Sequence, residues 1–266
     1  RIEAQNLQSL QYGSANAKPV TLSFWVKATK TGINTLSLTK DDSTAIRMVK
    51  EYTINSSDTW EYKTMTFVPD SSIKTAASAI VDDNGRGFQL NWVLKYGSTY
   101  NGTADAWTTS SHFTTTNGVN NMDSTSNTFF LTGVQLEIGE KATEFEHEPY
   151  QVTLNKCYRY YYKHVEGSTK MMGMGDYYVN TQLDCVVHLP VTMRAVPSLV
   201  QNSGTNYYLA YGGAASEFMS NAWNLFTTHE NVFSLYGTPA TNGTAGEARR
   251  VVTSSANSLI AMSAEL

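Results

Sequence analysis

Residues 132–164 read TGVQLEIGEKATEFEHEPYQVTLNKCYRYYYKH, and this stretch decides how the chain divides. Val134, Leu136 and Ile138 alternate with polar residues, which is the pattern of a strand with one buried face. Residues 148–157 have no clean alternation and predict a short helical turn. A cluster of tyrosines follows and begins a new set of strands. The stretch therefore predicts the closing strand of a β-sandwich, a hinge and a second β-rich module.

The same alternation predicts further strands on both sides of this stretch. They cover residues 19–28, 46–54, 60–68 and 87–96 in the first module, and residues 183–189, 206–211, 231–237 and 258–266 in the second. Turn-forming clusters such as NSSD and DDNG separate them. We therefore expect an all-β fold: a jelly-roll β-sandwich over residues 1–146 and a smaller β-rich module over residues 147–266. No fixed-period repeat is present, which argues against a long β-helix.

The phase of each strand predicts where the tryptophans lie. Trp92 is in phase with Phe88 and Leu90, so it is predicted to be core. Trp25 and Trp60 are also interpreted as packing residues.

Composition and charge bound the function. Hydrophobic residues make up 41% of the 266, charged residues make up 16%, and the net charge is −4. No basic footprint for nucleic acid is present. The apolar runs are far shorter than the ~20 residues that span a bilayer, so no membrane insertion is expected. The opening RIE is typical of the middle of a protein, and LIAMSAEL of a C-terminal strand.

The two cysteines do not make a disulfide framework for a chain of this length. Cys157 and Cys185 both have apolar or aromatic neighbours in the sequence. We interpret them as reduced, buried thiols, and a disulfide between them is the alternative.

The strings TGVQLEIGEKATEFE and CYRYY together resemble a module pair of tailed-bacteriophage virion proteins, mostly tail fibres and related adhesins. That family often has Gln at the position of Tyr158. RIEAQN, KPVTLSFWVKA and SSDTWEYKTMTF are similar to its carbohydrate-binding-module-like jelly roll, and HLPVTMRAVPSLV resembles a strand pair that follows its tyrosine cluster. The resemblance covers residues 1–165 well and the remainder more loosely. It implies location on the virion, at the tail or capsid surface, after assembly in a bacterial cytoplasm.

A glycan site is predicted around the strand at residues 87–96. Gln89 and Asn91 lie on its polar face and offer amides for sugar hydroxyls. Tyr100 and Trp107 lie in the long polar loop that follows, which we expect to fold over this face and to supply the stacking surface. Lys95 is placed to meet an acidic sugar. The alternative role for the two aromatic residues is to anchor the loop.

A structural calcium is a second candidate, because jelly-roll relatives in the resembled family often carry one. The acidic turn residues Asp41, Asp42, Asp82 and Asp83 are its candidate ligands. Glu3 and Glu137 are added if the first and last strands of the sandwich lie side by side. Simple solvated turns explain the same aspartates.

Tyr158, Arg159 and Tyr160 are predicted to lie near a subunit interface, where Tyr and Arg are enriched. Phage fibres that this chain resembles are usually homotrimers, so a homotrimer is expected. A half-buried strand with no partner explains the same tyrosines.

Known catalytic motifs are absent from the sequence, and its five histidines and two cysteines do not form a convincing zinc set. We expect a non-enzymatic virion adhesin that binds a host-surface glycan and other virion proteins. One alternative is a structural head or tail decoration or assembly protein without sugar binding. A less favoured alternative is a polysaccharide depolymerase, which needs only two facing carboxylates.

Overall fold

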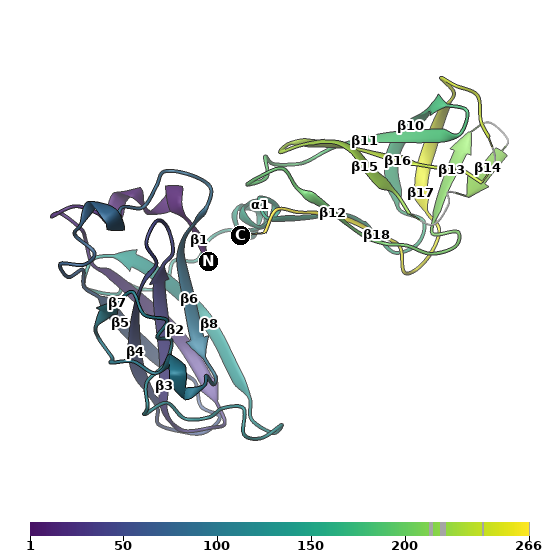
Figure 1. The fold of residues 1–266 in the computed structure, drawn as a ribbon. Coiled ribbons are helices and arrows are strands. Elements are labelled where there is room, and N and C mark those ends of the chain that lie inside the picture. Colours follow the sequence, from purple (N-terminus) through teal and green to yellow (C-terminus); the bar gives the residue numbers. More distant parts are fainter. Residues whose placement is uncertain (213–214, 219–221, 241, 266) are drawn as a thin grey trace. The chain divides into compact units, whose positions relative to one another are not determined.

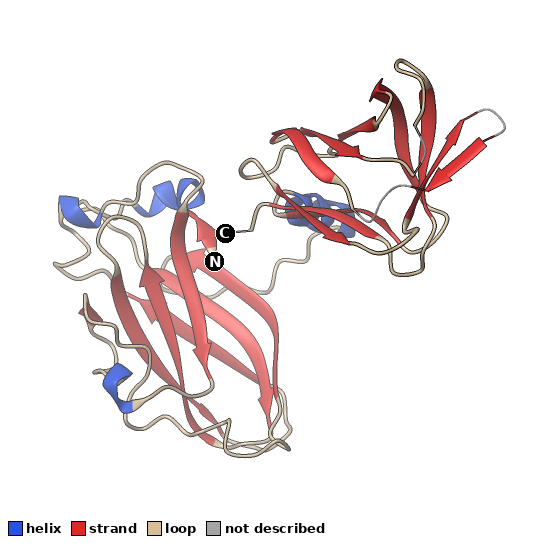
Figure 2. Cartoon of the chain, turned by 45° about the vertical axis from the view of Figure 1, so that its right-hand side comes forward, coloured by secondary structure: helices blue, strands red, loops and turns tan. Residues whose placement is uncertain are grey.

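The chain divides into two compact units, Arg1–His147 and Glu148–Glu265. This division lies one residue from the boundary that the sequence predicts. The structure is a computed structural model, and it describes residues 1–212, 215–218, 222–240 and 242–265. Figure 2 shows that strands dominate both units, so the all-β class is confirmed.

The first unit is a β-sandwich of two antiparallel sheets (Figure 1). The larger sheet has the order β1-β6-β3-β4-β7, formed by Ile2–Glu3, Arg86–Val93, Gly32–Lys40, Ile46–Ile54 and Trp107–Thr108. The smaller sheet has the order β5-β2-β8, formed by Glu61–Phe67, Val20–Ala28 and Phe129–Ile138. Three short 3-10 helices, Ala4–Leu10, Ala76–Ser78 and Ser98–Tyr100, lie in the connections. The two sheets thus form the expected β-sandwich, and its jelly-roll connectivity stays a prediction.

The core of this unit forms because alternate residues of each strand face inward. On β2 the inward side chains are Val20, Leu22, Phe24 and Val26, and all are almost fully buried, as the alternation predicts. They join inward side chains of the opposite sheet, including Phe88, in one hydrophobic cluster. Burying large apolar side chains of this kind contributes about 1.5–3 kcal/mol each.

Strand β8 departs from the predicted alternation at a β-bulge. Gly133 has a backbone φ of 58°, and the pairing with β2 shifts register there. Before the bulge Leu131 faces the core, and after it Leu136 does. Val134 therefore does not share the core face with Leu136 and is exposed, and Ile138 is half exposed at the strand end. The expectation of a continuous Val134–Leu136–Ile138 core stripe was wrong for this reason.

The long polar loop after β6 lies along the outer face of the larger sheet, as expected. The Thr35 hydroxyl donates to Thr114 Oγ1 at 3.0 Å, and the Val119 amide donates to the carbonyl of Ile33 at 2.8 Å. Near the loop's end, Asn121 donates to Asn34 Oδ1 at 2.7 Å. These bonds explain how a long Ser/Thr/Asn-rich loop is ordered by its own side chains.

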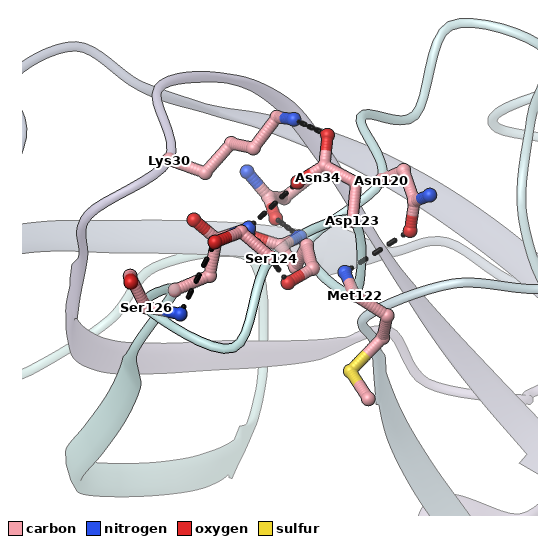
Figure 3. Close-up of polar contacts among 9 residues, drawn as sticks. Lys30, Asn34, Asn120, Met122, Asp123, Ser124 and Ser126 are labelled. Carbon is pink, nitrogen blue, oxygen red and sulfur yellow. Dashed lines mark hydrogen bonds and ion pairs between the residues drawn. The ribbon is translucent and has the colours of Figure 1, made fainter.

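An ion pair secures the last part of this loop. Lys30 bonds Asp123, whose other oxygen accepts from Asn127 Nδ2 at 2.8 Å. Figure 3 shows Lys30 reaching Asp123, with the turn residues around it. The hydrogen bond from Lys30, followed by that from Asn127, lowers the pKa of Asp123.

The second unit also contains two antiparallel sheets (Figure 1). The larger sheet has the order β14-β13-β17-β10-β11-β16-β15, formed by Ala215–Phe218, Tyr208–Gly212, Ala248–Thr253, Met171–Val179, Gln182–His188, Val232–Gly237 and Asn224–His229. The smaller sheet has the order β12-β18-β9, formed by Ser198–Asn202, Leu259–Ser263 and Tyr161–Glu166. The strand predicted at 258–266 corresponds to β18, and its last residue, Leu266, lies outside the described residues.

A separate hydrophobic cluster joins the two sheets of this unit, and it includes the fully buried Tyr177 and Phe233 of the larger sheet and Ile260 of the smaller one. Leu183, Cys185 and Val187 are buried in phase, as the alternation predicts. Both cysteines are free, and burial raises the pKa of the Cys185 thiol to about 11. Cys157 is exposed, so its predicted burial was wrong.

The tyrosine cluster follows the only α-helix in the described part of the chain, α1, Tyr150–Tyr158. Tyr158 ends this helix and Arg159 caps it, so Tyr158 and Tyr160 do not share one face of a strand. The Tyr158 ring meets the Tyr162 ring edge-on, with centroids 5.2 Å apart. Tyr158, Arg159 and Tyr160 are half-buried within this unit.

Because the two cores share no residue, we expect the two units to unfold independently of each other. Phe67→Ala removes a buried ring from the first core, and Phe233→Ala removes one from the second. Each change costs about 3–5 kcal/mol. Differential scanning calorimetry is expected to show two transitions, with each variant lowering a different one. A single transition, or an equal shift of both by either variant, contradicts this expectation.

Candidate functional site

The residues predicted to bind a glycan only partly come together. Lys95 lines a small pocket of about 100 Å³ beside the long loop, with Tyr96 and Asn101. Tyr100 packs beside this pocket, because the centroid of its ring lies 5.2 Å from that of the Tyr96 ring. Its position on the loop keeps it half exposed.

Gln89 and Asn91 do not line this pocket, although they lie on the outer face of β6 as predicted. Gln89 Nε2 donates to Asn91 Oδ1 at 2.6 Å, and Asn91 Nδ2 donates to Ser37 Oγ at 3.2 Å. Their side-chain amides therefore form hydrogen bonds with each other and with Ser37 of the same sheet.

Trp107 is a core residue and not part of a stacking surface. It is 8% exposed, and its indole Nε1 donates to the carbonyl of Val68 at 2.8 Å. Its ring meets the Tyr12 ring edge-on at 6.4 Å. The loop-anchor alternative is the correct one, because the short strand β7 brings Trp107 over the edge of β4 and into the core.

The four aspartates lie in neighbouring turns, but three of them already have structural roles. Asp41 Oδ2 pairs with Arg86 Nε at 2.5 Å, and Asp42 accepts from the Val81 amide. Asp83 closes its own turn by accepting from Gly85 N at 2.8 Å. Asp82 is exposed.

Within the described residues, no group of three or more acids, histidines or cysteines is placed to hold a metal. Glu3 and Glu137 do not meet, because β1 lies in the larger sheet and β8 in the smaller. The condition for adding them to a calcium site is therefore not met. A buried ammonium, that of Lys40, lies on the strand that leads into Asp41, and burial lowers its pKa despite Asp42 and Asp41 nearby.

The strongest surface feature of the first unit is a set of aromatic rings on the outer face of the β5-β2-β8 sheet. Five side chains form it, each 42–47% exposed, and we call it the aromatic face: Trp25, Trp60, Tyr62, Phe130 and Phe145. Contiguous exposed apolar patches are rare on monomeric proteins and mark interaction sites.

Strand register explains why the rings of the aromatic face gather. Trp25 pairs with Tyr62 across the β2–β5 ladder, and their ring centroids lie 5.4 Å apart. Lys27 pairs with Phe130 across the β2–β8 ladder. Its ammonium lies 5.0 Å from the Phe130 ring and 5.9 Å from the Trp60 ring.

The sequence did contain a signal for this surface. Trp25 follows Thr21 and Ser23 in the phase opposite to the Val20–Val26 core stripe, and Tyr62 is likewise out of phase with Met65. Trp25 and Trp60 were interpreted as packing residues. Trp25 does pack against Tyr62, but both tryptophans are 42% exposed and so also present their rings to solvent.

The segment that leaves β8 completes the aromatic face by folding back on it. Gln135 Oε1 accepts from the Glu146 amide at 2.8 Å, and Glu137 Oε2 accepts from the Thr143 amide at 3.0 Å. Phe145 is thereby held near Gly133, beside Trp25. Hydrogen bonds from Gln135 and then Thr143 lower the pKa of Glu137.

A half-buried carboxylate fixes the turn that carries Trp60. Glu61 accepts from the amides of Asn55 and Ser56, at 2.7 and 2.8 Å, and from Lys63 Nζ at 2.7 Å. Desolvation opposes ionisation of Glu61, but the bonds from Lys63, Ser56 and Asn55 outweigh it and lower its pKa from 4.5 to about 2.

Comparisons with protein-family models, curated proteins and solved structures found no match to this chain. Among the described residues, no helix has the length and apolar character to cross a membrane.

Trp107 and Tyr100 make a matched pair for testing the roles assigned above. Trp107→Ala is expected to destabilise the sandwich by about 3–5 kcal/mol, because it leaves a core cavity and an unpaired Val68 carbonyl. Tyr100→Ala removes a half-exposed ring and is expected to cost far less. Urea unfolding of both variants measures the difference. Equal stability of the two variants contradicts the core assignment.

Glu61 predicts a specific acid dependence of stability. Its folded pKa is depressed, so its contribution is present above pH 4.5 and is lost as the pH falls through about 2. Glu61→Gln is expected to lower stability at pH 7 and to flatten the decline between these pH values. Urea unfolding across this range tests it, with Glu140→Gln as control. If Glu61→Gln retains the full acid-dependent decline, the assignment is wrong.

Proposed function

We propose that this chain is a non-enzymatic phage virion adhesin, a tail-fibre or receptor-binding component, that binds host-surface glycan through the aromatic face. The observation that supports glycan binding is the gathering of Trp25, Trp60 and Tyr62, half exposed, on the outside of a regular sheet. The phage assignment is supported by the resemblance of residues 132–164 to virion proteins.

The chemistry of the aromatic face suits a sugar. Pyranose rings present C–H surfaces that pack on aromatic rings, and their hydroxyls need polar partners at the margin. Lys27 and Asp58 offer such partners, since they form a 3.1 Å ion pair beside Trp60 with Asp58 largely exposed. Because Trp25 and Tyr62 stand on paired strands and Glu61 fixes the turn that carries Trp60, little ordering of these rings is required when ligand binds.

Affinity at one such face is expected to be weak. A homotrimer, repeated around a virion, presents many copies, and linked sites raise the overall avidity by about 10²–10⁴ without any new contact. The predicted trimer therefore belongs to the proposed mechanism, with Tyr158, Arg159 and Tyr160 near its interface.

A structural virion joint is a second candidate, and helix α1 favours it. No residue of α1 is buried, and Tyr150 is 78% exposed. An aromatic residue exposed on a short helix is typical of a protein-contacting surface. This candidate requires no sugar binding by the chain.

Single substitutions on the aromatic face test the proposal. Trp60→Ala and Tyr62→Ala are each expected to weaken binding to host polysaccharide about tenfold or more, because large aromatic contacts dominate recognition energy. Both are surface changes, so the free energy of unfolding is expected to move by about 0.5 kcal/mol or less. A glycan array followed by titration with the best ligand measures the effect.

Phe226→Ala is the matched control, because Phe226 is 60% exposed but lies in the second unit. The Phe226→Ala variant is expected to bind glycan with the same affinity as the unchanged chain. If no glycan on the array binds, the result favours the second candidate, a structural virion joint. Glycan binding that survives both aromatic-face variants places the site elsewhere.

A further inference from the structure

The second unit has a groove that no predicted site includes. It has a volume of about 390 Å³ and lies where β13, β17 and β10 run side by side in the larger sheet. Its lining joins three kinds of group: the apolar side chains of Met171, Leu209 and Val252, the hydroxyl residues Ser168, Thr169, Thr253 and Ser254, and the pair Tyr211 and Arg250.

Two neighbouring arginines of β17 show what is unusual about this groove. Arg249 points to the other face, is 4% exposed and pairs with Glu247 at 2.5 Å. Arg250 is exposed, and its guanidinium lies 5.4 Å from the centroid of the Tyr211 ring. Among the described side chains, no carboxylate lies within ion-pairing distance of Arg250. Within the described part of the chain, the Arg250 guanidinium therefore makes no ion pair at this groove.

The strand pairing fixes the position of this charge. Arg250 lies opposite Tyr211 on β13 and opposite Met174 on β10, both in regular antiparallel register. Stacking on an aromatic face limits the guanidinium to a narrow range of orientations, and both Arg250 and Tyr211 line the groove. A planar donor fork held in this way matches a carboxylate.

We propose that this groove binds a carboxylated sugar, such as a hexuronate unit of an acidic polysaccharide. Arg250 receives the carboxylate, the hydroxyl residues at the margin bond the sugar hydroxyls, and Leu209 and Val252 contact the C–H face of the ring. The volume lies within the range of small-molecule sites. The site belongs to the second unit and does not depend on the aromatic face.

In the test, the intact chain is titrated with sodium glucuronate, glucuronate methyl ester and glucose, and binding is measured from changes in NMR chemical shifts. Glucuronate is expected to bind, and the two neutral sugars to bind about tenfold more weakly or not at all, because a hydrogen bond to a charged group is the main contact. Arg250→Gln is expected to weaken glucuronate binding about tenfold or more. Lys156→Gln is the matched control, because it removes one exposed positive charge from the same unit.

Two further measurements distinguish the groove from the aromatic face and a sugar site from a general affinity for carboxylates. Trp60→Ala is expected to leave glucuronate binding unchanged, because Trp60 belongs to the first unit. A short peptide with a free terminal carboxylate is expected to bind more weakly than glucuronate. The proposal is overturned if glucuronate does not bind, if Arg250→Gln and Lys156→Gln bind it equally, or if the peptide binds as well as glucuronate.

Discussion

Gly133 adopts a left-handed backbone conformation, with φ at 58°, and so changes the phase of the strand that closes the sandwich. The extra residue lets Leu131 and Leu136 face one core although their spacing is odd. It also directs Phe130 outward on one side of the bulge and Gln135 outward on the other. The first completes the aromatic face, and the second holds the returning segment that carries Phe145. Without this single bulge, one half of the strand would present its apolar side chains to water.

Much of the fold followed from alternation, because strands such as β11 bury every second side chain and leave those between them at least partly exposed. Strand β3 was not predicted, although Leu36 and Leu38 alternate with polar residues. Those polar residues are themselves buried, and Thr35 bonds Thr114 of the long loop, which only the tertiary structure reveals. The bulge at Gly133 was missed for a related reason, since glycine in a strand permits a phase change without specifying one. The helix was expected, but its last residue, Tyr158, was assigned to a strand.

The candidate sites were less predictable, because a side chain's role depends on what covers it. Trp107 lies in a polar loop and was expected to be exposed, but strand pairing at β7 carries it into the core. Trp25 was expected to pack, although its phase placed it among polar residues. The aspartates were correctly located in turns, yet sequence spacing cannot show that Asp41 is already paired with Arg86. Arg250 was not predicted as a site residue, because only the structure shows that it is exposed while the adjacent Arg249 is buried.

The unequal pairing of the first and last strands of the sandwich has a mechanical consequence. Strand β1 is held to β6 by two residue pairs, whereas β8 is held to β2 by eight. The side chains of Gln135 and Glu137 add further bonds between β8 and the segment leaving it. A pulling force applied across this unit therefore meets a weak attachment at one end and a strong one at the other. Strand β1 would peel away first, while the sheet that bears the aromatic face stays whole under load.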